Sequence, residues 1–210
     1  SDAKPKDGQH RGKVWLGIET STDRGPVVQY ERCALVASKS GSPGHSSEIP
    51  GPSDPAPLED LTKLVPEWDL SGLSPTGWDL GESRTDAMSD HVDLAPSLAR
   101  MTFNQAFVHR DASASIYGKR LVYGGHVQGL AQASLSRLLP GLATIVAWDG
   151  CDHIGPAFEG DLLKFRHELK EILPVNGGRL MRFEIRGATT TEQESSDSDI
   201  LVWTPIVFAP

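Results

Sequence analysis

The sequence predicts an α+β protein in which an antiparallel sheet wraps around one central helix. Two observations predict this class. Apolar side chains recur at helical spacing from Val127 to Leu138, and Pro140-Gly141 ends that helix. The chain then continues as a run of segments with the composition or the alternation of β-strands. One helix followed by consecutive strands is typical of a sheet built over a single helix.

The first 38 residues predict a β-hairpin that stands apart from this domain. Residues 13–19 and 27–37 are rich in Val, Ile, Leu and aromatic side chains, and the turn STDRG lies between them. An isolated two-stranded hairpin is marginal in water, so this one needs a sheet to join. No neighbouring segment of the sequence offers such a sheet.

Residues 39–77 predict a linker. They are rich in Pro, Gly and Ser, a composition that suits an extended segment without a core of its own. Within them, residues 58–65 have the pattern of a short helix that stops before Pro66. The predicted organisation is therefore a hairpin unit over residues 1–38, the linker, and a main domain over residues 78–210.

Three strands are expected after the central helix, and a fourth segment is compatible with a strand or a helix. Residues 142–148 predict a buried strand, and residues 179–187 alternate apolar and polar side chains. Residues 162–173 have the composition of a helix, but their alternation is also compatible with a long strand. Residues 199–208 predict the last strand, with Pro205 at a bulge or at an edge of the sheet.

Composition and charge narrow the classes of function. Hydrophobic residues make up 38% and charged residues 23% of the chain, which is typical of a globular protein. The formal net charge of −8 argues against a nucleic-acid partner, which would need a clustered basic face. No apolar run is long enough to cross a bilayer, so no membrane partner is expected. The lone thiols of Cys33 and Cys151, and the lack of a signal-peptide pattern, favour a cytoplasmic address.

The polar stretch MTFNQAFVHRDASAS, residues 101–115, is the first candidate for chemistry. Its residues Asn104, His109 and Asp111 allow three interpretations. A His-x-Asp pair offers two metal ligands, but no HExxH and no Cys/His pairing accompanies it, so no metal and no cofactor are expected. The same residue types are common in turns and helix caps. In the third interpretation, His109 moves protons near neutral pH while Asn104 holds a water.

A glycine pair at the start of the central helix favours the acid/base interpretation. In LVYGGHVQGL, Gly124 and Gly125 leave backbone N–H groups approachable at the positive end of the helix dipole. An acyl-thioester carbonyl placed at Gly125 would have its developing enolate oxygen stabilised there. Glycines at a helix start also simply permit close packing. Taken with the polar loop, the pair completes a set of water holder, proton carrier and oxyanion hole.

Three motifs in this order resemble a known family: N-x4-H-x-D at 104–111, YGGHV at 123–127 and F-x-GD at 158–161. The family is that of the MaoC-like (R)-specific enoyl-CoA hydratases, and the chain looks most similar to the C-terminal half of double-hot-dog hydratases of the mesaconyl-CoA hydratase type. The resemblance covers roughly residues 78–190. It implies a hot-dog fold, and it implies hydration of an enoyl-CoA or dehydration of a 3-hydroxyacyl thioester.

The resemblance also implies roles for single residues. His109 falls on the catalytic histidine, Gly125 on the glycine whose N–H polarises the thioester carbonyl, and Asn104 on the place of a catalytic aspartate. The residues expected in support are Asp111, which would orient His109, and Tyr123, Gly124 and His126. The residues expected to contact the phosphates of the substrate are Arg110, Lys119 and Arg120.

Asparagine at position 104 changes the expected chemistry. A carboxylate can share proton transfer with the histidine, whereas a carboxamide cannot. Either His109 acts alone as acid and base while Asn104 orients the water, or the activity is weakened or lost. The alternative function is therefore a non-catalytic acyl-thioester-binding or scaffolding subunit. A hot-dog thioesterase ranks lower, because residues 124–131 carry no carboxylate.

Two further expectations concern the surroundings of this site. Residues 1–38 resemble the last two strands of an N-terminal hot-dog unit, whose helix and earlier strands are absent from the printed sequence. A missing hot-dog half or a homo-oligomer is therefore expected as partner, besides an acyl-CoA or acyl-carrier thioester as substrate. Asp152 and His153 fall in a predicted turn after a strand, where solvation is expected.

Overall fold

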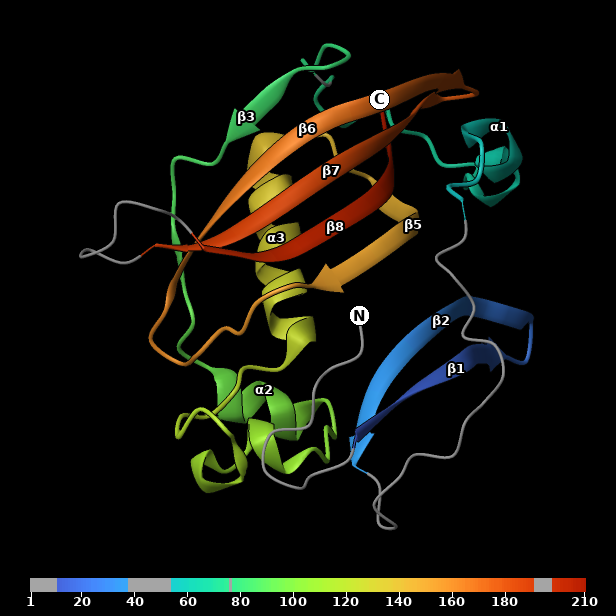
Figure 1. The fold of residues 1–210 in the computed structure, drawn as a ribbon. Helices are drawn as coiled ribbons and strands as arrows, with labels where there is room; N and C mark the ends of the chain where they lie inside the picture. The colour runs from blue at the N-terminus through green and yellow to red at the C-terminus, as the bar shows by residue number, and fades with distance from the viewer. Residues whose placement is uncertain (1–10, 38–53, 76, 191–197) are drawn as a thin grey trace. The chain divides into compact units, whose positions relative to one another are not determined.

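The computed structural model describes residues 11–37, 54–75, 77–190 and 198–210. The chain divides into two compact units, Ser1–Ser53 and Asp54–Pro210. The first unit contains one β-hairpin. The second contains a six-stranded sheet and the helices (Figure 1).

The first unit forms the antiparallel hairpin that the sequence predicts. Strand β1 (Arg11–Thr22) pairs with β2 (Gly25–Ala37). The tight turn between them requires Gly25, whose φ of 116° lies in the left-handed region that other residues rarely adopt. Large apolar side chains are exposed on both strands: Val14, Trp15, Leu16, Val27, Val28 and Val36.

The second unit is built around one antiparallel sheet. Its strands are β3 (Ser83–Thr85), β4 (Asp90–His91), β5 (Thr144–His153), β6 (Leu162–Val175), β7 (Gly178–Thr190) and β8 (Ser198–Ala209). Their order across the sheet is β3-β6-β7-β8-β5, and β4 pairs with the start of β6. Helix α3 (Gly124–Leu138) lies across one face of this sheet (Figure 1). The predicted α+β class, with a sheet over one central helix, is confirmed.

Strand β6 settles the ambiguity over residues 162–173. Its side chains alternate between buried and exposed positions over most of its length. The buried ones are Leu163, Phe165, His167 and Leu169. A period of two residues places all four on one face of a strand, whereas a helix would spread them around its circumference. The alternation, and not the helix-like composition, was therefore the informative pattern.

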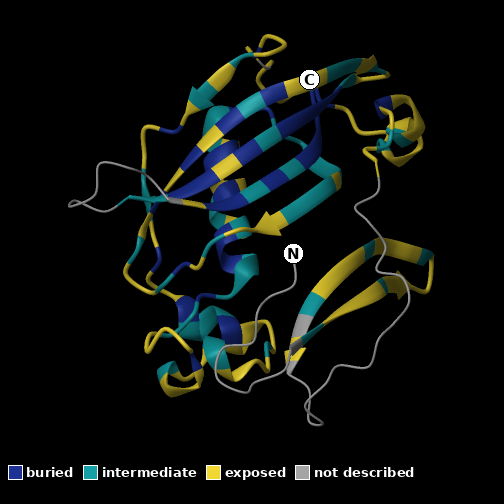
Figure 2. Ribbon diagram, viewed as in Figure 1, coloured by how far each residue is buried: buried dark blue, intermediate teal, exposed yellow. Residues whose placement is uncertain are grey.

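The main core lies between α3 and the inner face of the sheet, where Figure 2 shows the buried residues concentrated. Helix α3 contributes Val127, Ala131 and Leu135, which are four residues apart and share one face of the helix. The largest side chains that they meet are Phe165, Phe183 and Trp203. Because the helix is packed along its length, the sheet also determines where its first turn lies.

Pro205 lies on β8, an interior strand between β7 and β5. It is opposite Trp148 of β5, and the register of that pairing shifts between Trp148 and Cys151. Proline has no N–H to donate to the ladder, so an irregularity beside it costs the sheet little. The structure therefore supports the bulge and not the edge position.

The second half of the predicted linker packs on the sheet. Helix α1 (Leu58–Leu61) runs into a 3-10 turn, η1 (Thr62–Leu64). The buried cluster that forms here consists of Leu58, Leu70, Leu180, Ile206 and Phe208. Because neighbouring residues of a strand point to opposite faces, this cluster covers the face of the sheet away from α3. The compact unit thus begins at Asp54, within the predicted linker, while residues 39–53 of that linker lie outside the described residues.

Candidate active site

The polar stretch of residues 101–115 lies at the N-terminal end of α3. Helix α2 (Ala95–Met101) precedes it, and two 3-10 turns form within it, η2 (Phe107–His109) and η3 (Ala112–Ala114). Figure 1 shows these green segments gathered beside the start of α3. The ring of His109 contacts the ring of Tyr123, the residue before α3, so the polar stretch packs against the start of this helix.

His109 has one ring nitrogen in a hydrogen bond, and the other has no hydrogen-bond partner among the residues that the structure describes. Its Nδ1 lies 2.9 Å from the carbonyl oxygen of Leu121. Because a carbonyl only accepts, Nδ1 carries the proton and donates it, so that in the neutral ring Nε2 holds the lone pair. The half-buried ring also meets Tyr123 edge-on, with ring centroids 5.9 Å apart. A neutral imidazole in this tautomer is suited to accept a proton at Nε2.

Asn104 uses the oxygen of its side-chain amide for a hydrogen bond within its own loop. Its Oδ1 accepts a hydrogen bond from the backbone N–H of Ala106 at 3.0 Å. This is the turn that asparagine commonly forms with the residue two positions further on. The half-buried side chain keeps its NH2 group for other contacts. A contact of Asn104 with a reacting water therefore stays a prediction.

Asp111 begins the turn η3 and does not orient His109. Its Oδ1 accepts from the hydroxyl and from the backbone N–H of Ser113, each at 2.8 Å. These hydrogen bonds hold the pKa of Asp111 below its usual value. The orienting contact that the resemblance assigns to Asp111 is made instead by the carbonyl of Leu121.

Gly124 and Gly125 leave room for two rings at the start of α3. A Cβ on Gly125 would lie 2.7 Å from the hydroxyl of Tyr123, and a Cβ on Gly124 would lie 2.6 Å from Nε2 of His153. Only glycine lets both rings lie this close to the backbone. The first N–H groups of a helix have no partner within the helix, and in α3 that of His126 donates to the carbonyl of Tyr123 at 2.8 Å.

Two further histidines are present at this helix start. His126 lies in the first turn of α3, where it is buried, and burial lowers its pKa. His153 was expected in a turn, yet it is the last residue of β5, and its ring lies against Gly124 although the residue stays exposed. The sequence holds no signal for this contact, because it depends on how β5 passes the end of α3.

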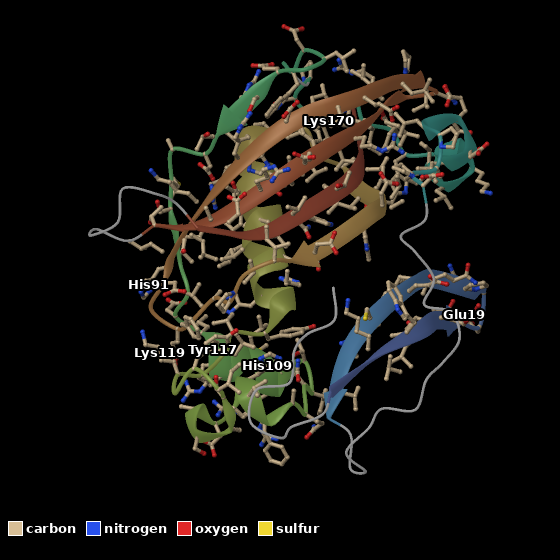
Figure 3. All side chains as sticks on the ribbon, in the orientation of Figure 1. Glu19, His91, His109, Tyr117, Lys119 and Lys170 are labelled. Atoms are coloured by element: carbon tan, nitrogen blue, oxygen red, sulfur yellow. The ribbon has the colours of Figure 1, made fainter. Side chains whose placement is uncertain are left out.

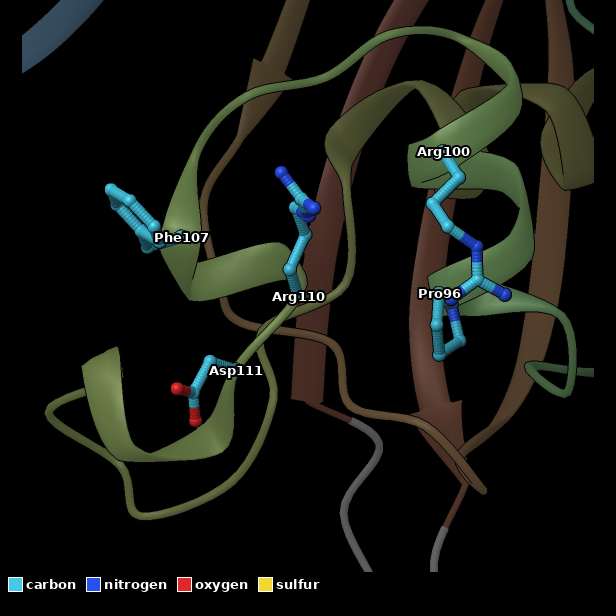
Figure 4. Close-up of a pocket in the computed structure, with 5 residues that line it drawn as sticks. All are labelled: Pro96, Arg100, Phe107, Arg110 and Asp111. Carbon is cyan, nitrogen blue, oxygen red and sulfur yellow. The ribbon is translucent and has the colours of Figure 1, made fainter.

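The basic residues of the site differ in what they contact. A hollow of about 300 Å³ beside η2 is lined by Pro96, Arg100, Phe107, Arg110 and Asp111 (Figure 4). Arg110, one of the expected phosphate contacts, is thus joined there by Arg100 from α2, which the sequence pattern does not single out. Lys119 has its Nζ 5.6 Å from the ring centroid of Phe158. Arg120 is paired with the carboxylate of Glu159.

A second polar cluster lies inside the core. Oγ of Ser134 and Nε2 of His167 are 2.8 Å apart, and Ser134 also hydrogen-bonds to Asp86. Arg137 donates to Asp86 and to Asp90 at 2.7 and 2.6 Å. Serine, histidine and aspartate are the residue types of a hydrolase triad. Here Ser134 and His167 are fully buried beneath the sheet, so the cluster is structural.

Among the residues that the structure describes, no group of three His, Cys, Asp or Glu side chains is placed to hold a metal ion. Within those same ranges, no helix combines the length and the apolar character needed to cross a membrane.

Comparisons with known proteins point to one group. No family model matches the chain. Mesaconyl-CoA hydratase of Cereibacter sphaeroides is 30% identical over 171 residues, which cover 73% of this chain and 48% of that protein. A MaoC domain protein dehydratase of Chloroflexus aurantiacus gives a TM-score of 0.79 at 19% identity, over 99% of this chain and 67% of that one. A conserved hypothetical protein of Mycobacterium tuberculosis with a double hot-dog fold gives a TM-score of 0.75 at 30% identity, over 98% of this chain and 65% of that one.

The antiparallel sheet over one central helix is therefore a hot-dog fold. More particularly, the chain is similar in sequence to mesaconyl-CoA hydratase and in fold to MaoC-like dehydratases, which confirms the predicted resemblance and the predicted fold. The chain spans about half the length of the curated relatives it matches.

Proposed function

We propose that this protein hydrates the α,β double bond of an enoyl-CoA, or catalyses the reverse dehydration of a 3-hydroxyacyl thioester. The observation that carries the proposal is the tautomer of His109. Its Nδ1–H donates to the carbonyl of Leu121, its ring contacts Tyr123 before α3, and its Nε2 has no hydrogen-bond partner within the described ranges. Homology to a CoA hydratase supports the same class of reaction.

His109 is proposed to supply both proton transfers. In hydration, Nε2 takes a proton from water while the water oxygen bonds to the β-carbon of the enoyl thioester. The electron pair of the double bond moves toward the thioester oxygen, where the N–H of Gly125 donates to the developing charge. The imidazolium then returns its proton to the α-carbon, and the carbonyl re-forms. The carbonyl of Leu121 accepts from Nδ1–H throughout and stabilises the charged ring.

The side chains around the start of α3 surround the proposed position of the thioester. Tyr123 contacts the ring of His109 and covers Gly125, so its phenol ring forms one wall. His126 and Gly124 complete the first helical turn. Asn104 cannot carry a proton, so it contributes at most a hydrogen bond from its NH2 group.

The hollow beside η2 is proposed to receive the phosphates of coenzyme A. Arg100 and Arg110 line it, and guanidinium groups bind phosphate oxygens in paired hydrogen bonds. Lys119 supplies a further positive charge beside Phe158. Arg120 is a weaker candidate for this contact than the sequence indicates, because Glu159 already neutralises it.

The first test is the variant His109→Ala assayed for hydration of crotonyl-CoA. Loss of the only proposed acid/base group is expected to lower kcat by at least about 100-fold. His91→Ala is the matched control, because His91 is exposed on β4 (Figure 3) and is expected to leave kcat unchanged. Wild-type protein that is inert toward every enoyl thioester tried, or full activity in His109→Ala, would contradict the proposal.

The alternative is a non-catalytic subunit that binds acyl thioesters. The observation in its favour is Asn104, which stands where the resemblance implies an aspartate and which uses its Oδ1 within the loop. A tight complex with acyl-CoA and no turnover would establish this alternative. Release of free thiol from acyl-CoA would instead indicate a thioesterase.

A further inference from the structure

His153 is a second imidazole at the start of α3, contributed by the end of β5. A Cβ on Gly124 would lie 2.6 Å from its Nε2 and 2.9 Å from both Cδ2 and Cε1, so one edge of the ring lies over the glycine. The ring also contacts Sγ of Cys151, which is 4.0 Å from Nε2. A thiol is a weak hydrogen-bonding partner, so it leaves the ring nitrogens of His153 available to a stronger one.

The two imidazoles flank consecutive residues. His109 contacts Tyr123, and His153 contacts Gly124, the next residue of the chain. Both rings therefore reach the positive end of α3, where the thioester oxygen would lie. Asn104, the expected water holder, has its Oδ1 engaged by the N–H of Ala106. Asp111 of the same loop accepts hydrogen bonds from Ser113, whereas β5 places a heteroaromatic acceptor beside the same helical turn.

We propose that His153, and not Asn104, holds the reacting water of the hydration site. This inference rests on the proposed function. In the step, one O–H of water donates a hydrogen bond to a ring nitrogen of His153 and stays intact. The other O–H bond breaks: its proton goes to Nε2 of His109 while the oxygen bonds to the β-carbon. His153 ends the step with the protons it began with, so it is a water-positioning residue.

The surroundings of His153 favour the neutral ring that this role requires. Although His153 is exposed as a residue, the protein atoms packed around its ring desolvate it and lower its pKa, and the adjacent carboxylate of Asp152 only partly opposes this effect. The positive end of α3 acts in the same direction as burial. Burial also raises the pKa of the Cys151 thiol to about 12, so no thiolate is present beside the ring to favour its protonation.

The experiment compares His153→Ala, His153→Gln and Gly124→Ala in steady-state hydration of crotonyl-CoA. Loss of the water contact in His153→Ala is expected to lower kcat by about 100-fold and to leave KM nearly unchanged. His153→Gln keeps an acceptor oxygen and is expected to recover a large part of kcat. Gly124→Ala places a methyl group where the ring lies, so it is expected to reproduce the loss with His153 still present. His91→Ala serves as the control.

Wild-type kcat in His153→Ala would overturn this inference and leave the proposed function standing, provided that His109→Ala is inactive. Wild-type protein that is inert toward enoyl thioesters would remove the proposed function, and this inference with it. If His153→Ala does not fold, as judged by circular dichroism, wild-type turnover in His153→Gln and Gly124→Ala together would overturn the inference.

Discussion

In the proposed hydration, the residue at position 104 would decide how the proton transfers are shared. A carboxylate there could take a proton and pass it on, whereas the carboxamide of Asn104 only donates or accepts hydrogen bonds. The loop itself does not require asparagine, because its contact with Ala106 needs only an acceptor oxygen. The residue can therefore be changed without removing the turn.

We expect Asn104→Asp to raise kcat for crotonyl-CoA by on the order of tenfold, since a second group then shares proton transfer with His109. The thermal midpoint should stay close to that of the wild type, because the new carboxylate still accepts from Ala106. Asn104→Ala is the matched control, and loss of the turn hydrogen bond should cost about 1 kcal/mol of stability. An unchanged kcat in Asn104→Asp would show that this position does not face the reacting atoms.

At the scale of elements, a buried hydrogen-bond chain joins α3 to β6. Asp86 only accepts, so Ser134 donates to it and must in turn accept from Nε2–H of His167. Nδ1 of His167 then holds a lone pair without a hydrogen-bond partner. Arg137 of the same helix extends the chain toward β4 through Asp90. These contacts set the rotation of α3 on the sheet, and with it the direction of its first turn.

The buried hydrogen-bond chain through His167 predicts that the free energy of unfolding falls in mild acid. Burial lowers the pKa of His167 to about 4, from an ordinary value of 6.5. Between these values the unfolded chain binds more protons than the folded one, so stability is fully present above pH 6.5 and is lost as the pH falls toward 4. The loss attributable to this residue is about 3 kcal/mol.

Urea unfolding at pH 7.5 and at pH 4.5 measures this loss. His167→Gln should flatten the dependence of the unfolding free energy on pH, whatever its effect at pH 7.5, because it removes the titrating group. His91→Gln, at an exposed position, should keep the wild-type slope. Equal slopes in His167→Gln and the wild type would rule out His167 as the origin.

At the scale of the whole molecule, we propose that a second hot-dog unit covers the hairpin β1–β2, provided either by a longer form of the protein or by another copy. Two observations support this proposal. Trp15 and Leu16 are among the large apolar side chains that the hairpin exposes, and a bare two-stranded ribbon is marginal in water. The curated relatives are also about twice as long as the region that matches them.

The chain by itself should therefore self-associate through the hairpin. Leu16→Lys places a charge in the apolar surface and should shift the protein toward the monomer in sedimentation velocity. Thr20→Lys introduces the same charge at an exposed polar position of β1 and should leave the association unchanged. A wild-type chain that is monomeric at micromolar concentration would contradict the prediction.

Local sequence patterns predicted much of the fold. The helical spacing of Val127, Ala131 and Leu135 and the alternation along residues 162–173 report which face of each element is buried, since burial follows the period of the element. Composition was less informative than alternation, as residues 39–77 show. Their Pro, Gly and Ser content predicts a linker, yet Leu58 and Leu70 cover one face of the sheet.

The sequence by itself predicted the resemblance to hot-dog hydratases, the α+β class and the residues proposed for the site, because motifs, turns and periodic burial depend on residues near one another in the chain. Only the tertiary structure decided which partners the site residues have. Leu121 rather than Asp111 orients His109, and β5 brings His153 onto Gly124. Contacts of this kind join separate elements, so they follow from how the sheet packs on α3 and not from any local pattern.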